Sequence, residues 1–311
     1  MGLEQGDDQG LEQQPPDLRI SAYIDAAAEM GGVSFSELTA DEKPNARKFF
    51  GFFREVLSPL RPSEPSPDFE RLFRFLSDEE VAAIGQTVWG TRQQEGIDRP
   101  GEFNPNDFFG YNIFSSQIAT PRNMLSRDPS TLPIKTQEAA CHEVVHALSY
   151  RSVKIDDRKN RAEVRSGIMR RTQTLGQSPD DSPKIKTKFI REELNEILTD
   201  YYVLFSIRSH VAFLEGKSLD QVSGELDQAF PDKHDIFDLG QAWSRLVGDN
   251  VMHQAYFYGE VEPLIRATNA IEGGLFDRLN ALARENDLNA MRSLLESIGS
   301  RDKPGSKKKR R

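Results

Sequence analysis

The chain has 311 residues, of which 37% are hydrophobic, so it is long enough and apolar enough to bury a sizeable globular core. It carries a formal net charge of −9, one cysteine (Cys141) and no run approaching the roughly 18 apolar residues that a membrane span needs. These features exclude a disulfide scaffold and a cysteine-only metal site. They predict a protein without membrane contact or signal peptide, which we expect in the cytoplasm.

The two ends differ from the rest of the chain in composition. Residues 1–18 hold five acids and no base, whereas residues 301–311 hold seven bases and one acid. We predict that both are disordered tails. Between them, residues 19–126 are expected to form an N-terminal helical region leading into a small sheet, and residues 127–300 the core of the chain with C-terminal helices.

The charge outside the tails bears on nucleic-acid binding. Residues 19–300 carry a net charge of −10, and an acidic body argues against a broad phosphate-binding surface. We therefore expect no nucleic-acid partner, except through the basic run Lys307–Arg311, which is also typical of a solvated tail.

Helical periodicity is strong near the N-terminus. A capping-box spacing at Ser77–Glu80 indicates a further helix running toward Trp89, and Asp98–Asp107 has the composition of a loop. Tyr111–Thr120 is rich in β-branched and aromatic residues and predicts a strand. The earlier helices are predicted over Ile20–Met30, Asn45–Leu57 and Asp68–Leu76.

The second half of the chain predicts one more strand, at Ala162–Thr174, and an exposed loop at Gln177–Lys186. The remaining periodic segments are helical: Thr136–Tyr150, Phe189–Ile207, Leu219–Phe230, Ile236–Asn250 and Phe276–Ile298.

The first helix of this half carries the sequence His-Glu-Val-Val-His from His142 to His146. Four residues turn a helix by about 400° and raise it by about 6 Å, so the two imidazoles project side by side, as two ligands of one tetrahedral ion require. Glu143 lies beside this row, where a carboxylate can accept a proton from a metal-bound water. Such histidines can also be hydrogen-bonded core residues. Cys141 points about 100° away from His142 around the helix and is typical of a small buried residue.

The next helix carries the sequence Asn-Glu-Ile-Leu-Thr-Asp from Asn195 to Asp200, with Glu196 and Asp200 on one face. Buried acids need a cation or its ligands to neutralise them. Glu196 is therefore our candidate for a third zinc ligand, and Asp200 for a hydrogen-bond acceptor from a zinc-bound histidine. The alternative is that this acidic row is a solvated helix face.

These two motifs together resemble those of the gluzincins, the thermolysin-like zinc metallopeptidases. The resemblance covers the two motifs and their helices. It implies that His142, His146 and Glu196 bind one Zn²⁺, that Glu143 is the general base, that Asp200 orients His142 and that Asn195 supports the other histidine. The gap from His146 to Glu196 is longer than in thermolysin.

The resemblance also implies an oxyanion donor and a substrate-binding strand. The sequence offers His253, Tyr256 and Tyr258 as donors, and we favour Tyr258 or His253. Asn112–Thr120 is our candidate for the sheet edge that would bind an extended peptide, although it could equally be an interior strand.

The sequence thus predicts an α+β, mainly helical chain with a zincin-like fold, in which a small sheet lies beside the HExxH helix and helices close the C-terminal side. The expected function is zinc-dependent hydrolysis of peptide bonds in a peptide or protein substrate. The alternatives are a zincin-fold binding protein without catalysis and a nucleic-acid-associated protein that uses the basic tail.

Overall fold

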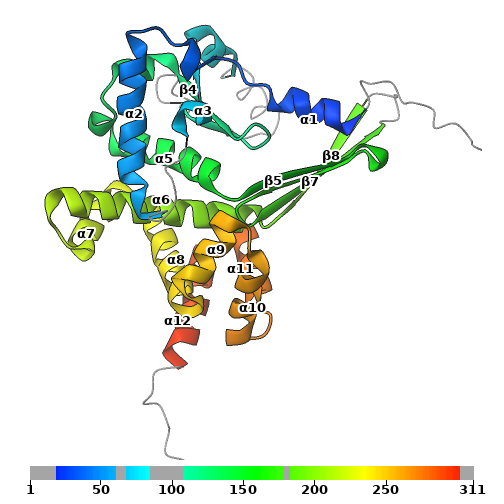
Figure 1. Ribbon diagram of the computed structural model, residues 1–311. Coiled ribbons are helices and arrows are strands. Elements are labelled where there is room, and N and C mark those ends of the chain that lie inside the picture. The colour runs from blue at the N-terminus through cyan, green and yellow to red at the C-terminus, as the bar shows by residue number, and fades with distance from the viewer. Residues whose placement is uncertain (1–18, 61–67, 85–107, 178–182, 302–311) are drawn as a thin grey trace, which may run out of the picture.

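The computed structural model describes residues 19–60, 68–84, 108–177 and 183–301 (Figure 1). They form two four-stranded sheets and a larger set of helices, which confirms the α+β, mainly helical class. The helices are α1 (Ile20–Ala28), α2 (Glu42–Val56), α3 (Phe69–Leu72), α5 (Ile134–Leu148), α6 (Glu192–Glu215), α7 (Leu219–Ala229), α8 (His234–Val247), α9 (Asp249–Tyr258), α10 (Val261–Ile271), α11 (Leu275–Arg284) and α12 (Leu288–Arg301).

The strands of the first sheet are shorter than most of those in the second. The first contains β1 (Val33–Ser34), β2 (Phe73–Leu76), β3 (Gly110–Asn112) and β4 (Gln117–Pro121). The second contains β5 (Arg151–Asp156), β6 (Arg161–Ser166), β7 (Met169–Gln177) and β8 (Pro183–Ile190). Both predicted tails, apart from Arg301 at the end of α12, and the predicted loop Asp98–Asp107 lie outside the described residues.

The first sheet has the order β1-β2-β4-β3, with β2 and β4 parallel and the other neighbours antiparallel. Phenylalanines of α2 pack against this sheet. Phe49 and Phe53 contact Phe73 with ring centroids 5.4 and 5.6 Å apart, and all three rings are buried. Aromatic pairs of this kind add about 0.5–1.5 kcal/mol each to the burial of their surface.

The predicted helix Asp68–Leu76 is wrong in its second half. Only Phe69–Leu72 is helical, and Phe73–Leu76 forms β2 between β1 and β4. Pairing with β4 buries Phe73, Phe75 and Leu76, and this tertiary contact outweighs the local helical preference. The helix predicted after Ser77 is present over residues 78–84, and its predicted extension to Trp89 lies outside the described residues.

The predicted strand Tyr111–Thr120 is a hairpin of β3 and β4. The side-chain oxygen of Asn112 accepts hydrogen bonds from the backbone N–H groups of Phe114 and Ser115, and Ser116 has a left-handed φ of 60°. An asparagine that bonds to the backbone two residues onward favours a turn. This turn breaks the strand after Asn112.

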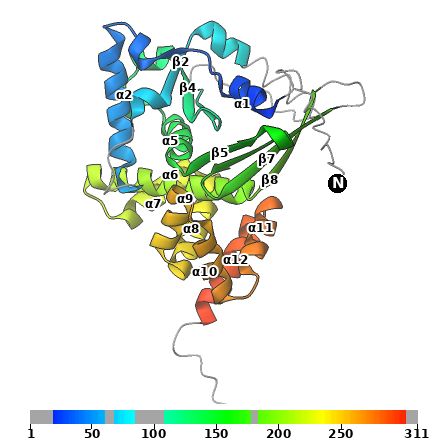
Figure 2. The ribbon, with the colours of Figure 1, turned by 45° about the vertical axis from the view of Figure 1, so that its right-hand side comes forward.

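The second sheet is an antiparallel meander in the order β5-β6-β7-β8. Its apolar face packs against α1, where Ile20 and Ile24 contact Ala162 and Leu175 (Figure 2). The predicted strand Ala162–Thr174 is two strands, β6 and β7, that meet at a turn after Ser166.

The predicted exposed loop Gln177–Lys186 is wrong where it is described. Gln177 pairs with Pro183, and residues 183–186 continue into β8. The alternation of Lys184, Ile185 and Lys186 is typical of a strand with one polar and one apolar face. The prediction of a loop gave more weight to the prolines and the polar composition of this segment than to that alternation.

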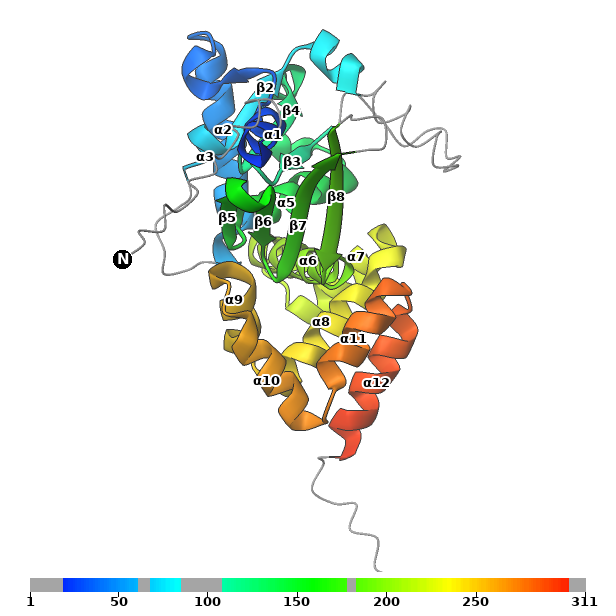
Figure 3. The same cartoon turned by 90° about the vertical axis from the view of Figure 1, so that its right-hand side faces the viewer.

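Helix α5 lies between the first sheet and α6, and α8 to α12 lie on the opposite side of α6 (Figures 1 and 3). The predicted helix Phe189–Ile207 begins instead at Glu192 and continues to Glu215. The predicted helices Ile236–Asn250 and Phe276–Ile298 are each divided, by Gly248 with φ 93° and by Asn286 with φ 54°. Among the described residues, no helix has the length and hydrophobicity needed to span a membrane.

An ion pair joins α2 to the 3-10 helix Arg122–Ser126 that follows β4. The Arg122 guanidinium donates to both carboxylate oxygens of Glu42, over 2.6 and 2.8 Å. Hydrogen bonds, chiefly from Arg122 and then from Thr39, lower the pKa of Glu42 from 4.5 to about 2, although partial burial opposes this shift.

Glu42→Gln should therefore lower the free energy of unfolding by about 1 kcal/mol at pH 7. The ion pair stabilises the fold above about pH 4.5, and this contribution is lost as the pH falls toward the folded pKa of about 2. Denaturant titrations of both proteins should show a difference at pH 3 that is less than half of the difference at pH 7. Equal differences at the two pH values would contradict the assignment.

Candidate metal centre

Helix α5 presents the first motif. Pro133 precedes its first residue, and Ala140, Cys141, Val144 and Val145 are almost fully buried, so the apolar side of the helix faces the core. Cys141 is buried, as expected. The rings of His142 and His146 lie one turn apart, with centroids separated by 4.7 Å.

Helix α6 presents the second motif opposite α5. It begins after Arg191, which adopts a left-handed φ of 65°, and Leu194 and Leu198 anchor it in the core. Glu196 and Asp200 project from one face of this helix, one turn apart. Because α5 and α6 pack against each other, these carboxylates reach the histidines of α5.

Three potential ligand atoms converge between the two helices. The Nε2 atoms of His142 and His146 are 3.0 Å apart, and Oε2 of Glu196 lies 3.3 Å from the first and 3.1 Å from the second. Ligands that bind one tetrahedral zinc at about 2.0–2.1 Å are separated by about 3.4 Å. The three side chains therefore fit a single divalent ion without rearrangement of the helices.

Asp200 holds the ring of His142 from behind. Its Oδ1 lies 2.8 Å from Nδ1 of His142, an arrangement in which Nδ1 donates to Asp200. In the neutral form of this tautomer, Nε2 presents its lone pair to the cluster. Lys233, in the 3-10 helix Pro231–Lys233, donates to the same Oδ1 over 2.9 Å and to Glu138 of α5 over 2.6 Å. Sequence analysis missed Lys233 and Glu138, and no local pattern marks either residue.

The electrostatics of the cluster favour positive charge at its centre. Burial lowers the pKa of His142, but the hydrogen bonds to Asp200 and Glu196 outweigh it and raise the pKa to about 10. Burial likewise raises the pKa of Glu196, yet the two histidines hold it well below its ordinary value. The carboxylates thus remain ionised and stabilise a cation beside them, whether that is an imidazolium or a metal ion.

Glu143 lies next to the cluster and points toward the first sheet. Its Oε2 accepts a hydrogen bond from the backbone N–H of Tyr111, over 3.1 Å, and burial raises the pKa of its carboxyl group. Tyr111 belongs to β3, the edge strand of that sheet, and its ring stacks at 6° to the ring of His146. The prediction that Asn112–Thr120 forms an edge strand is therefore wrong for β4, which lies inside the sheet. The edge strand beside the cluster is β3.

Thr199, and not Asn195 as expected, contacts the ring of His146. Its Nδ1 lies 3.5 Å from the hydroxyl oxygen of Thr199, which in turn lies 2.6 Å from the hydroxyl oxygen of Tyr256. Asn195, expected to support this histidine, instead accepts a hydrogen bond from the backbone N–H of Ile168 over 2.9 Å. Asn195 therefore fixes the β6–β7 turn against α6, and Thr199 lies at the histidine.

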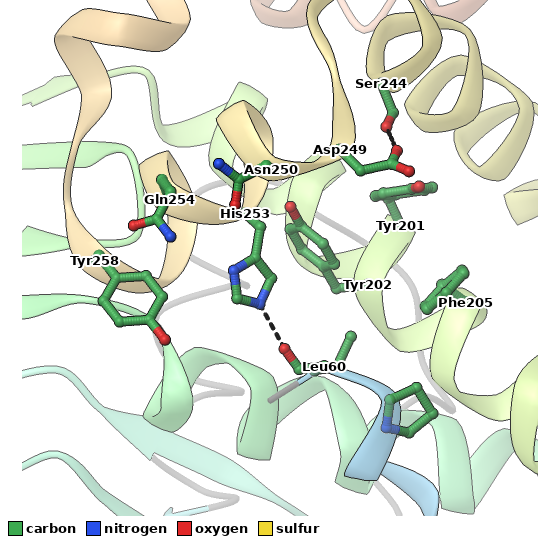
Figure 4. A pocket seen from close by; sticks show the side chains of 11 residues that line it. Leu60, Tyr201, Tyr202, Phe205, Ser244, Asp249, Asn250, His253, Gln254 and Tyr258 are labelled. Atoms are coloured by element: carbon green, nitrogen blue, oxygen red, sulfur yellow. Dashed lines mark hydrogen bonds between the residues drawn. The ribbon is translucent and has the colours of Figure 1, made fainter. Parts of the chain in front are cut away.

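The predicted oxyanion donors His253 and Tyr258 lie elsewhere. Both line a cavity of about 450 Å³ between α6, α8 and α9, shown in Figure 4, and none of the three candidate ligands lines it. His253 bonds through Nε2 to the backbone carbonyl of Leu60. Tyr256, the third aromatic candidate, reaches the cluster only through Thr199, to which its hydroxyl group is hydrogen-bonded. Its side chain is fully buried, so we assign it a structural role in the core. The structure therefore does not bring His253 or Tyr258 to the cluster.

Comparison with known proteins identifies no similar protein. The chain matches no protein-family model, no curated protein and no solved structure. The function must therefore be argued from the side chains of the cluster themselves.

The hydrogen bond of Asp200 to His142 gives a direct test of the cluster. Asp200→Asn removes the charge that orients and polarises the imidazole, so the affinity for Zn²⁺ that we expect of this cluster should fall by about 10- to 100-fold. Competition titration against a chromogenic chelator measures this change. Asp249→Asn, the same substitution in the separate cavity, should leave the affinity unchanged, and an unaltered affinity in Asp200→Asn would contradict the assigned role.

Proposed function

We propose that this protein is a zinc-dependent metallopeptidase with a zincin-like fold of the gluzincin type. The observation that carries the proposal is the convergence of His142, His146 and Glu196 within 3.3 Å of one another, with Glu143 beside them. Two imidazoles and one carboxylate form the ligand set that leaves a position for water on a catalytic zinc ion. Glu196 is partly exposed, so the cluster is open to solvent.

Bound zinc would supply a water of lowered pKa and a Lewis acid for the peptide carbonyl. The residues of the chain would do the rest. Glu143 would accept the proton of the attacking water, and its raised pKa brings it closer to that of a general base acting near neutral pH. Asp200, held by Lys233, would keep His142 in the tautomer that presents Nε2.

The surroundings of the cluster also support the proposal. An edge strand, β3, lies beside α5, where an extended peptide could add to the sheet by backbone hydrogen bonds. The long interval between His146 and Glu196 is occupied largely by the second sheet, which leaves α5 and α6 in direct contact. The unusual spacing of the two motifs is therefore compatible with a shared metal site.

Glu143→Gln tests the proposal. The variant should keep one zinc per chain, because Glu143 is not a ligand, and should lose about 10²- to 10⁴-fold of its rate of peptide cleavage. Metal analysis and a broad library of quenched fluorescent peptides provide the two measurements. Glu193→Gln, which alters an exposed glutamate of α6, is the matched control and should cleave like the parent protein.

Two outcomes would count against the enzyme. Equal cleavage by Glu143→Gln and the parent would refute the role of the general base. Zinc bound by the parent without cleavage of any peptide would favour a zincin-like binding protein instead.

A further inference from the structure

The second sheet reverses the charge of the rest of the chain. Residues 151–191, which include its four strands, hold twelve Lys and Arg and five Asp and Glu, a net charge of +7 in a chain of −9. The remainder therefore carries −16. The average charge of the body conceals this segregation, and the expectation that only the C-terminal tail could contact phosphates did not allow for it.

The strand register places most of these cations on one face. Paired residues of antiparallel strands share a face, and successive residues along each strand point to opposite faces. Following the register from β8 to β5 defines the basic face, whose charged residues are Lys184, Lys186, Lys188, Arg170, Arg161, Glu163, Arg165, Lys154 and Asp156.

The two faces of this sheet are chemically distinct. The opposite face carries Ala162, Val164 and Leu175, which are buried, and packs in part against α1. On the basic face, the three lysines of β8, Lys154 and Arg161 are exposed. The sheet projects away from the helical body, with α1 on the apolar side (Figures 1 and 2).

Five cations of the basic face lie beyond ion-pairing distance of any carboxylate among the described residues. Glu163 pairs with Arg165 at 2.9 Å and contacts Arg170 at 4.0 Å, and Asp156 pairs with Lys159 at 3.6 Å. No carboxylate of the described residues lies within ion-pairing distance of the others, which are Lys154, Arg161, Lys184, Lys186 and Lys188. Lys154 nevertheless faces Glu163 in the register of β5 and β6 and acts electrostatically on its carboxylate. The lysines of β8 stand about 6.8 Å apart in a row, because each residue of an antiparallel strand advances about 3.4 Å.

We propose that the basic face binds the phosphate backbone of double-stranded nucleic acid without reading its sequence. Rows of unpaired Lys and Arg neutralise backbone phosphates and release counterions, and this term supplies most non-specific binding. The side chains between the cations include the hydroxyl groups of Thr172 and Thr174, which can donate to phosphate oxygens.

The composition of the basic face favours a duplex over other polyanions. Single-stranded chains bind to aromatic platforms on which bases stack, and this face has no aromatic residue. Membrane-surface segments insert apolar side chains among the lipids, whereas Ile190, half-buried at the base of β8, is the only large apolar residue on this face.

The salt dependence of binding to a labelled DNA duplex of mixed sequence tests the proposal. If all five unpaired cations contact phosphates, the logarithm of the association constant should fall with the logarithm of salt concentration with a slope of about −4.5. Lys184→Gln/Lys186→Gln/Lys188→Gln should reduce the slope to about −2 and weaken binding about eightfold per lysine at 0.1 M salt. Fluorescence anisotropy of the full-length proteins measures both quantities.

Three controls separate this surface from other sources of affinity. Lys48→Gln/Arg245→Gln/Arg284→Gln removes the same charge from exposed positions of α2, α8 and α11 and should leave the slope nearly unchanged. Replacement of Lys307–Arg311 by glutamine removes the contribution of the tail. Circular dichroism verifies that the lysine variant retains its fold, as expected for three exposed side chains.

The proposal is overturned by any of three results. The lysine variant could bind the duplex like the parent, or binding could depend wholly on the tail. Alternatively, the lysines could be required for binding to phosphatidylserine vesicles or to polyglutamate while the duplex shows no salt-dependent binding, which would assign the face to a membrane or to an acidic protein. None of these results bears on peptide cleavage, so the two proposals fail independently.

Discussion

The packing of α5 against α6 is the constraint on which the rest of the structure depends, because it buries carboxylates and imidazoles between two helices. Such groups cannot be buried singly, and here each has a partner of complementary charge or hydrogen-bonding capacity. The partners come from several parts of the fold. Tyr111 of the first sheet donates to Glu143, and Lys233, ahead of α8, donates to Asp200. The polar cluster therefore joins the first sheet, the two central helices and the C-terminal helices.

Helix α6 serves two environments because successive residues of a helix point in different directions. Asp200 faces His142 at the cluster, whereas Tyr201 and Tyr202, its immediate neighbours, line the separate cavity of Figure 4. Tyr256 contacts Tyr202 at a centroid distance of 5.1 Å and bonds to Thr199, so packed side chains connect the cavity with the cluster. Helix α6 thus lies between the cluster and the cavity, and packed side chains connect the two sites.

Acidic and basic residues are concentrated in different parts of the fold. Acids gather on the helical body, where the histidines lower the pKa of Glu196, and His142 and Lys233 lower the pKa of Asp200, against the opposing effect of burial. Bases gather on the second sheet, where one face packs apolar residues against α1 and the other exposes Lys154, Arg161 and the three lysines of β8. Since a sheet alternates its side chains between two faces, a strand of alternating lysine and apolar residues can serve a core and a charged surface together. The chain thereby combines an acidic body with a basic arm.

The sequence by itself determined the features that depend on helical periodicity: His142 beside His146, Glu143 next to that row, and Glu196 one turn from Asp200. These relations are local, since the geometry of one helix sets them. Only the tertiary structure decided that Thr199 lies at His146, that Lys233 holds Asp200, that His253 and Tyr258 line another cavity, and that Phe73–Leu76 and Pro183–Ile190 are strands. Those outcomes depend on contacts between residues far apart in the chain, and no local pattern encodes which distant partner a side chain or a strand edge will meet.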